Sequence, residues 1–106
     1  MIPKNIFEHL EFPTGEKEKF QALLQEKNIK IERILSSGQR SPHTGWHDQE
    51  KDEWVLLLSG KAGIEFEGQK LMHLKKGDHL HIKAHLKHRV VYTSKRPPCI
   101  WLAIHF

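Results

Sequence analysis

From residue 29 onward, apolar and polar side chains alternate with a period of two, the pattern of half-buried β-strands. Turn residues such as Gly60 and Gly77 separate short runs of this kind. The runs lie at 29–35, 54–58, 62–66, 71–74, 80–82, 90–92 and 100–106. Their even spacing predicts a mainly all-β protein, an antiparallel sandwich or a barrel such as a jelly roll.

Residues 14–28 follow a different period and predict one short N-terminal helix. Apolar residues recur there at helical spacing, at Phe20, Leu23 and Leu24. Thr14 is a suitable N-cap, and Asn28 is a suitable stop. We therefore expect an N-terminal extension with a short helix over 1–28, followed by the barrel over 29–106.

The chain has 106 residues, enough for a single domain with one modest core. No apolar run approaches the roughly 18–20 residues that a membrane-spanning helix needs. The first residues also lack the long apolar stretch of a secretory signal. These features predict a cytoplasmic protein without a membrane partner.

Charge and cysteine content narrow the possible functions further. The formal charge is +4, and the basic residues are scattered between turns without interleaved aromatic residues. Nucleic-acid binding, which needs clustered basic residues, is therefore the least supported function. Cys99 is the single cysteine and lies in an apolar run, which predicts a small buried side chain with no disulfide.

Histidine is the outlier of the composition, with nine residues. They are His9, His43, His47, His73, His79, His81, His85, His88 and His105. Histidine is a common metal ligand and proton carrier, so the excess favours a metal site. We expect His79, His81 and His85 at the surface or at strand edges. His105 alternates with Trp101 and Ala103, and an inward-facing last strand would make it a partner of the ligands.

Two spacings in the chain match a known pair of motifs. In the first motif, Glu53 is followed after six residues by Gly60. In the second motif, the matching spacing is the interval from Gly77 to His88. Through these spacings the chain resembles the cupin superfamily, in particular its small single-domain bacterial members. The resemblance covers residues 29–106 and implies an antiparallel cupin barrel. In the second motif, Lys83 and His85 stand where the family usually has Pro and Gly, and Tyr92 replaces an Asn.

The first motif departs from the family at its pair of histidines. Counting back from Glu53 across three residues gives His47 and Gln49, whereas four residues give Trp46 and Asp48. We prefer His47 and Gln49 because this alignment keeps one imidazole. Asp48 remains the alternative ligand.

The resemblance implies a metal site at the barrel mouth, held by His47, Gln49, Glu53 and His88. Two imidazoles and a carboxylate suit a divalent transition metal such as Fe, Mn, Ni or Zn, and an amide adds only a weak donor. The resemblance further implies a homodimer and a small-molecule substrate, with the chain acting as a metal-dependent oxygenase or isomerase. The alternative is a non-catalytic module that binds or senses a small ligand or metal.

Overall fold

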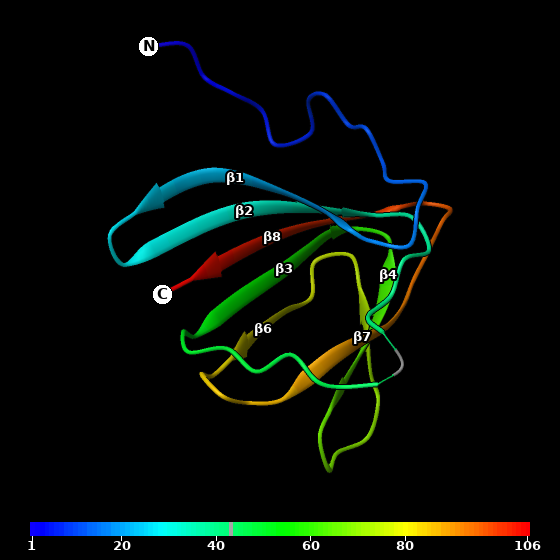
Figure 1. Ribbon diagram of the computed structural model, residues 1–106. Helices are drawn as coiled ribbons and strands as arrows, with labels where there is room; N and C mark the ends of the chain where they lie inside the picture. Colours follow the sequence, from blue (N-terminus) through cyan, green and yellow to red (C-terminus); the bar gives the residue numbers. More distant parts are fainter. Residues whose placement is uncertain (43) are drawn as a thin grey trace.

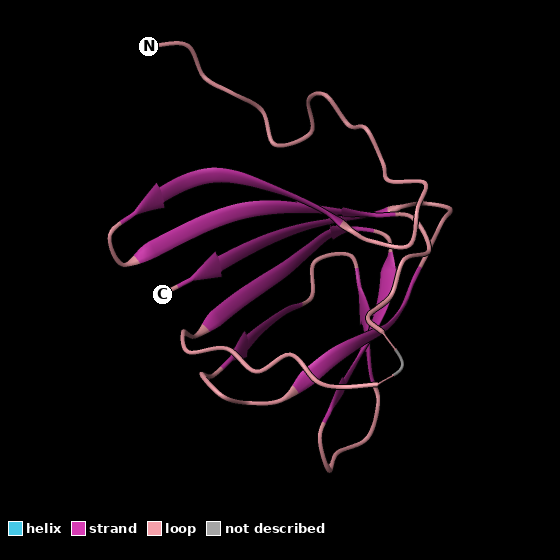
Figure 2. Cartoon of the chain, viewed as in Figure 1, coloured by secondary structure: helices cyan, strands magenta, loops and turns pink. Residues whose placement is uncertain are grey.

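The computed structural model describes residues 1–42 and 44–106, so His43 lies outside the described residues. The described chain is built from strands and loops, with no helix (Figure 2). The strands are β1 Lys19–Glu26, β2 Ile29–Ser36, β3 Glu53–Ser59, β4 Lys61–Phe66, β5 Met72–Lys75, β6 His79–Ile82, β7 His88–Thr93 and β8 Cys99–His105. Each strand predicted from residue 29 onward is therefore present.

The strands form two antiparallel sheets that enclose one core. The larger sheet has the order β1-β2-β8-β3-β6, and the smaller sheet has the order β5-β4-β7. Figure 1 shows the larger sheet as a fan of long strands, with β4 and β7 on the opposite side. This arrangement confirms the antiparallel all-β prediction.

The predicted helix over 14–28 is wrong, because most of this segment is strand β1. A β-bulge explains the misleading pattern: Ala22 pairs with Glu32 and Leu24 pairs with Ile31, so Leu23 is left without a partner. One extra residue in a strand shifts its period of two and mimics helical spacing. Pairing with β2 then decides the structure, since strand pairing overrides weak local preferences.

The segment before β1 is fastened to the sheet by a buried arginine. The Arg33 guanidinium donates hydrogen bonds to the carbonyl oxygens of Ile6, Glu8 and His9 at 2.8, 2.6 and 3.2 Å. It also donates to Gln21 Oε1 at 2.6 and 2.8 Å. These bonds tie the N-terminal segment to β2. Arg33 is only 6% exposed, so the bonds are shielded from competing water.

Two turns explain why the motif positions carry glycine. Gly60 joins β3 to β4 with φ of 87°, and a Cβ there would lie 2.7 Å from Cys99 Sγ. Gly77, before β6, has φ of 93°. His85 has φ of 63° at the position where the family usually has Gly. Positive φ is costly for residues other than glycine, so His85 carries backbone strain.

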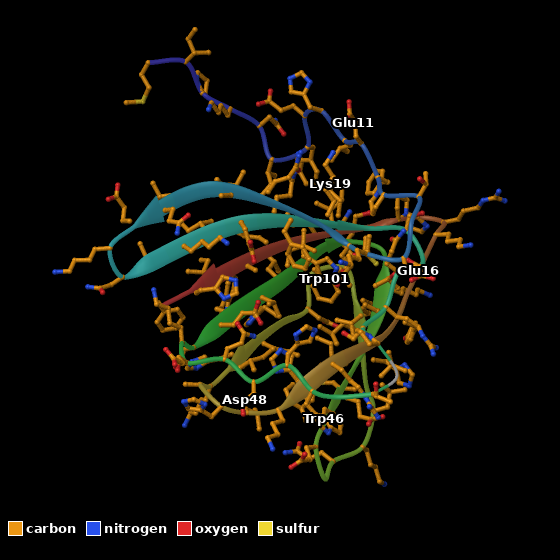
Figure 3. The ribbon with its side chains drawn as sticks, viewed as in Figure 1. Glu11, Glu16, Lys19, Trp46, Asp48 and Trp101 are labelled. Atoms are coloured by element: carbon orange, nitrogen blue, oxygen red, sulfur yellow. The ribbon has the colours of Figure 1, made fainter. Side chains whose placement is uncertain are left out.

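Apolar side chains from both sheets fill the interior between them. Trp101 lies near the centre of the molecule (Figure 3) and packs in a cluster with Leu57 and Ala62, all three at most 3% exposed. The rest of the cluster is Ile34, Val55, Ile64, Phe66, Leu74, Ile82, Cys99 and Ala103. The described residues form no helix that is long and apolar enough to cross a membrane.

Candidate metal centre at the barrel mouth

One end of the larger sheet presents polar side chains to the interior. Lys30 of β2 pairs with His105 of β8, His105 pairs with Glu53 of β3, and Glu53 pairs with Ile82 of β6. Paired residues on neighbouring strands point to the same face. The strand register therefore places an amine, an imidazole and a carboxylate in one row across the sheet.

This row borders a cavity of about 470 Å³. Its apolar walls include Ile34, Val55 and Trp101. The polar groups at the cavity are Glu18, Lys30, Glu32, His47, Gln49, Glu53, His88 and His105. All four residues predicted as metal ligands therefore line one cavity.

Three of the predicted ligands converge closely. Gln49 Nε2 donates a hydrogen bond to Glu53 Oε1 at 3.4 Å and lies 3.5 Å from His88 Nε2. His88 Nε2 lies 3.7 Å from the same Glu53 oxygen. Glu53 and His88 are 7% and 6% exposed, so the carboxylate and imidazole meet in a largely dry setting.

The fourth predicted ligand, His47, is held beside His88 but is more exposed. The two residues form an isolated β-bridge, with His47 N donating to His88 O at 2.8 Å and His88 N donating to His47 O at 3.2 Å. Their ring centroids are 5.7 Å apart. His47 Nε2 lies 3.2 Å from Ser41 Oγ, which fixes the ring at the rim of the cavity.

The side chain of Asp48 is engaged elsewhere. Its Oδ1 lies 2.8 Å from His85 Nδ1, outside the cavity lining. Figure 3 shows Asp48 on the loop between β2 and β3, at the edge of the molecule. Since residues i and i+2 of an extended segment share a face, Gln49 points inward together with His47.

The structure adds a residue that the sequence analysis did not single out. Glu32 is 5% exposed, and its Oε1 lies 2.8 Å from His105 Nε2. His105 Nε2 also lies 3.5 Å from Glu53 Oε2. Among the described His, Cys, Asp and Glu side chains, Glu32, Glu53 and His105 form the group whose donor atoms all lie within 4.8 Å of one another.

These contacts shift the protonation equilibria of the site. The hydrogen bond with Glu32 raises the pKa of His105. Burial lowers the pKa of His88, but the Glu53 carboxylate and the Leu86 carbonyl together outweigh burial, and the pKa is raised. Burial and the nearby His88 lower the pKa of His47. Burial opposes the charge of Glu32, yet the His105 contact holds its pKa below the usual range.

The donor chemistry of the cavity fits a divalent transition metal. Imidazole nitrogens and carboxylate oxygens are the ligands that Fe, Mn, Ni and Zn accept in proteins. Glu53 Oε1 and His88 Nε2 lie 3.7 Å apart, and Gln49 Nε2 lies within 3.5 Å of both. An amide binds a metal through its oxygen, so Gln49 would turn its amide to bring Oε1 to the ion. Such close donors from a loop and two strands can share one ion.

The remaining histidine-rich segment lies outside the cavity. His79, His81 and His85 are exposed, as the sequence analysis expected. His81 Nε2 contacts Asp52 Oδ2 at 2.8 Å on the outer surface. Cys99 is fully buried, and burial raises the pKa of its thiol, so it is a core side chain without nucleophilic character.

A family profile described as Cupin domain matches residues 32–105, which is most of the chain. The chain belongs to the cupin family. The cupin is similar over its whole length to a solved structure from Ralstonia eutropha JMP134, a protein provisionally assigned as a mannose-6-phosphate isomerase. The two chains are 44% identical with a TM-score of 0.91, and the match covers 99% of the cupin and 97% of that chain.

More distant structures share the fold alone. An RmlC-like cupin from Desulfovibrio desulfuricans is 18% identical with a TM-score of 0.76, covering 99% of this cupin and 96% of that chain. A cupin superfamily protein from Desulfitobacterium hafniense DCB-2 is 20% identical with a TM-score of 0.79, covering 100% and 92%. No curated protein matches the chain.

Proposed function

We propose that this cupin binds a divalent transition metal at the barrel mouth and acts as a metal-dependent isomerase on a small polar molecule. The ligands are His47, Gln49, Glu53 and His88. The convergence of Gln49, Glu53 and His88 within 3.7 Å beside the cavity carries the proposal. The isomerase class follows from the similarity to the Ralstonia eutropha protein, and a sugar phosphate is the substrate class that this similarity favours.

The chain's own residues suit this chemistry. A divalent metal, when bound, supplies a Lewis acid that polarises a substrate oxygen. Glu53 and His88 are held in place by the sheet and by the hydrogen bond between His88 Nδ1 and Leu86 O at 2.8 Å. Ile34, Val55 and Val90 line the inner wall, and their apolar side chains would keep water away from a substrate bound there. A cavity of about 470 Å³ accommodates a ligand of modest size.

The second candidate is a non-catalytic binding or sensor module. Gln49 favours this alternative, because an amide is a weaker metal ligand than an imidazole or a carboxylate and would hold a metal less tightly. Both candidates bind a metal or small ligand in the same cavity. Turnover separates them, because a sensor module binds ligand without forming a metal-dependent product.

Elemental analysis of protein purified without added metal or chelator tests the metal site. We expect Fe, Mn, Ni or Zn in near-stoichiometric amount, a marked loss in His88→Ala, and no change in the matched control Asp48→Asn. Less than about a tenth of an equivalent, with failure to reload, would contradict a metal site built to bind tightly. The loaded protein is then assayed for conversion of mannose 6-phosphate to fructose 6-phosphate, and ligand binding without conversion would favour the sensor module.

We further propose that the cupin is a homodimer and that β1 supplies part of the interface. Phe20, Leu23 and Leu24 are 59%, 51% and 44% exposed on a strand at the edge of the larger sheet. Edge strands with exposed apolar side chains are favourable sites for pairing with another chain. The last strand, β8, lies inside the sheet and has mostly buried side chains. Sedimentation equilibrium of the wild type and Leu24→Glu would give a dimer and a monomer, respectively.

A further inference from the structure

We propose that the barrel mouth binds a second divalent cation, held by Glu32, Glu53 and His105, with the Glu53 carboxylate bridging the two ions. This inference rests on the proposed function, in which the first ion is held by His47, Gln49 and His88 together with Glu53. The second site is inferred from the position of Glu53 between two groups of ligands and from the number of carboxylates at the cavity.

The two oxygens of Glu53 face two different groups of ligands. Oε1 lies 3.4 Å from the Gln49 amide nitrogen and 3.7 Å from His88 Nε2. Oε2 lies 3.5 Å from His105 Nε2 on the other side. A carboxylate with one oxygen toward each group is suited to bridge two metal ions, which sit roughly 3.5–4 Å apart in two-metal sites.

The inner group, formed by Glu32, Glu53 and His105, has the spacing of a metal site. His105 Nε2 is 2.8 Å from Glu32 Oε1 and 3.5 Å from Glu53 Oε2, and all three donors lie within 4.8 Å of one another. Neighbouring ligands at the usual distance of about 2.1 Å from a metal are roughly 3 Å apart. The ion would replace the proton between Glu32 and His105, and that proton would pass to solvent.

The charges at the cavity leave room for a second cation. Glu18, Glu32 and Glu53 line it, and Lys30 is the one lysine or arginine among its described lining residues. Lys30 Nζ lies 3.5 Å from Glu32 Oε2, so its charge is directed at a single carboxylate. Glu32 and Glu53 are 5% and 7% exposed, and buried carboxylates need counter-charge. A bound cation would supply it in place of the proton on His105. Burial raises the pKa of Glu18, and repulsion from Glu53 adds a smaller contribution.

The inner group also borders a second space. A neighbouring cleft of about 480 Å³ shares Lys30, Glu32, Gln49 and His105 with the cavity. A cation at Glu32 and His105 would therefore stand where the two spaces meet. Water or a substrate oxygen could complete its coordination from the side of the cleft.

The inference can be tested without any substrate. The metal-free full chain is titrated with Mn²⁺, and isothermal titration calorimetry counts the bound equivalents. We expect two equivalents in the wild type and one in Glu32→Gln. Glu18→Gln is the matched control, because this carboxylate lines the same cavity but accepts its hydrogen bond from Ser36, which is not a ligand. Loss of its charge should lower the affinity and leave the number of bound ions at two. His105→Gln provides a second variant of the inner site, and thermal unfolding confirms that each variant is folded.

Electron paramagnetic resonance of the Mn²⁺-loaded wild type gives a second readout. Two ions bridged by one carboxylate should show a spin-coupled signal, and Glu32→Gln should return the signal of an isolated ion. A single equivalent in the wild type, or two equivalents retained by both Glu32→Gln and His105→Gln, would overturn the inference.

The two proposals fail in different ways. If His88→Ala loses one equivalent while Glu32→Gln and His105→Gln change nothing, the first site stands and the second is refuted. If His88→Ala keeps all bound metal while Glu32→Gln loses it, the inner group is a metal site but the ligand set proposed for the function is wrong.

Discussion

Glu32 and His105 are joined by a hydrogen bond of 2.8 Å between Oε1 and Nε2, although 73 residues separate them in the sequence. They meet because β2 and β8 are neighbours in the larger sheet. The contact raises the pKa of His105 and, against the effect of burial, lowers the pKa of Glu32. Each residue therefore favours the charged form of the other.

This pairing predicts a pH dependence of stability in the metal-free protein. The contribution of His105 to folding stability is complete below about pH 6.5, which is the ordinary pKa of histidine in an unfolded chain. This contribution is lost as pH rises through the higher pKa of His105 in the folded protein. The contribution of Glu32 is lost in the opposite direction, as pH falls through its lowered pKa. We expect the stability difference between wild type and His105→Gln to be largest in mildly acidic solution and to shrink above neutral pH. Urea unfolding at a series of pH values checks this, and a constant difference would contradict it.

Arg33 predicts a second effect on stability, located at the N-terminal segment. Its guanidinium donates to three carbonyl oxygens of residues 6–9 and to Gln21. Lysine cannot reproduce this fork of donors, so Arg33→Lys should cost at least about 2 kcal/mol. Hydrogen exchange should accelerate at residues 6–9. Arg96→Lys, an exposed position, is the matched control, and equal stability of the two variants would refute the anchoring role.

The sequence could predict that the candidate ligands within the two motifs lie at one cavity, and their binding of a metal stays a prediction. Glu53 and His88 are placed by spacing to the turn glycines, and turn geometry leaves a readable local signal. Gln49 and His47 follow from counting back along one extended segment. Each of these inferences uses residues close together in the chain, where sequence pattern carries most information.

The features that were missed depend on distant pairing. Glu32 follows the apolar residue Ile31, and Arg33 precedes the apolar residue Ile34. In such a pattern, charged residues are expected to face solvent, although both are buried here. Only the register of β2 with β8 shows that Glu32 meets His105. Strand β1 was missed because the bulge at Leu23 imitates a helical period.

The left-handed backbone at His85 predicts an unusual order of stabilities. Its φ is 63°, which costs a residue with a Cβ about 1–2 kcal/mol. Both His85→Gly and His85→Ala remove the contact with Asp48, so their comparison isolates the backbone. We expect the glycine variant to be more stable by about 1 kcal/mol in urea unfolding. At exposed Lys87, where φ is not positive, the same pair of substitutions should give the reverse order.

Gln49 predicts a gain in metal affinity on substitution. Its amide oxygen is a weak metal ligand, and its amide nitrogen lies 3.4 Å from Glu53 Oε1 and 3.5 Å from His88 Nε2. An imidazole is a much stronger ligand for Zn²⁺, so Gln49→His should tighten binding roughly tenfold or more. Competition with a chromophoric chelator measures this affinity.

Asp48→His is the matched control for this gain, because the Asp48 side chain contacts His85 and lies outside the cavity lining. We expect no tightening in that variant. If Asp48→His tightens Zn²⁺ binding while Gln49→His does not, the first motif aligns one residue earlier and Asp48 occupies the ligand position. The two variants therefore decide between the alignments that the spacing before Glu53 leaves open.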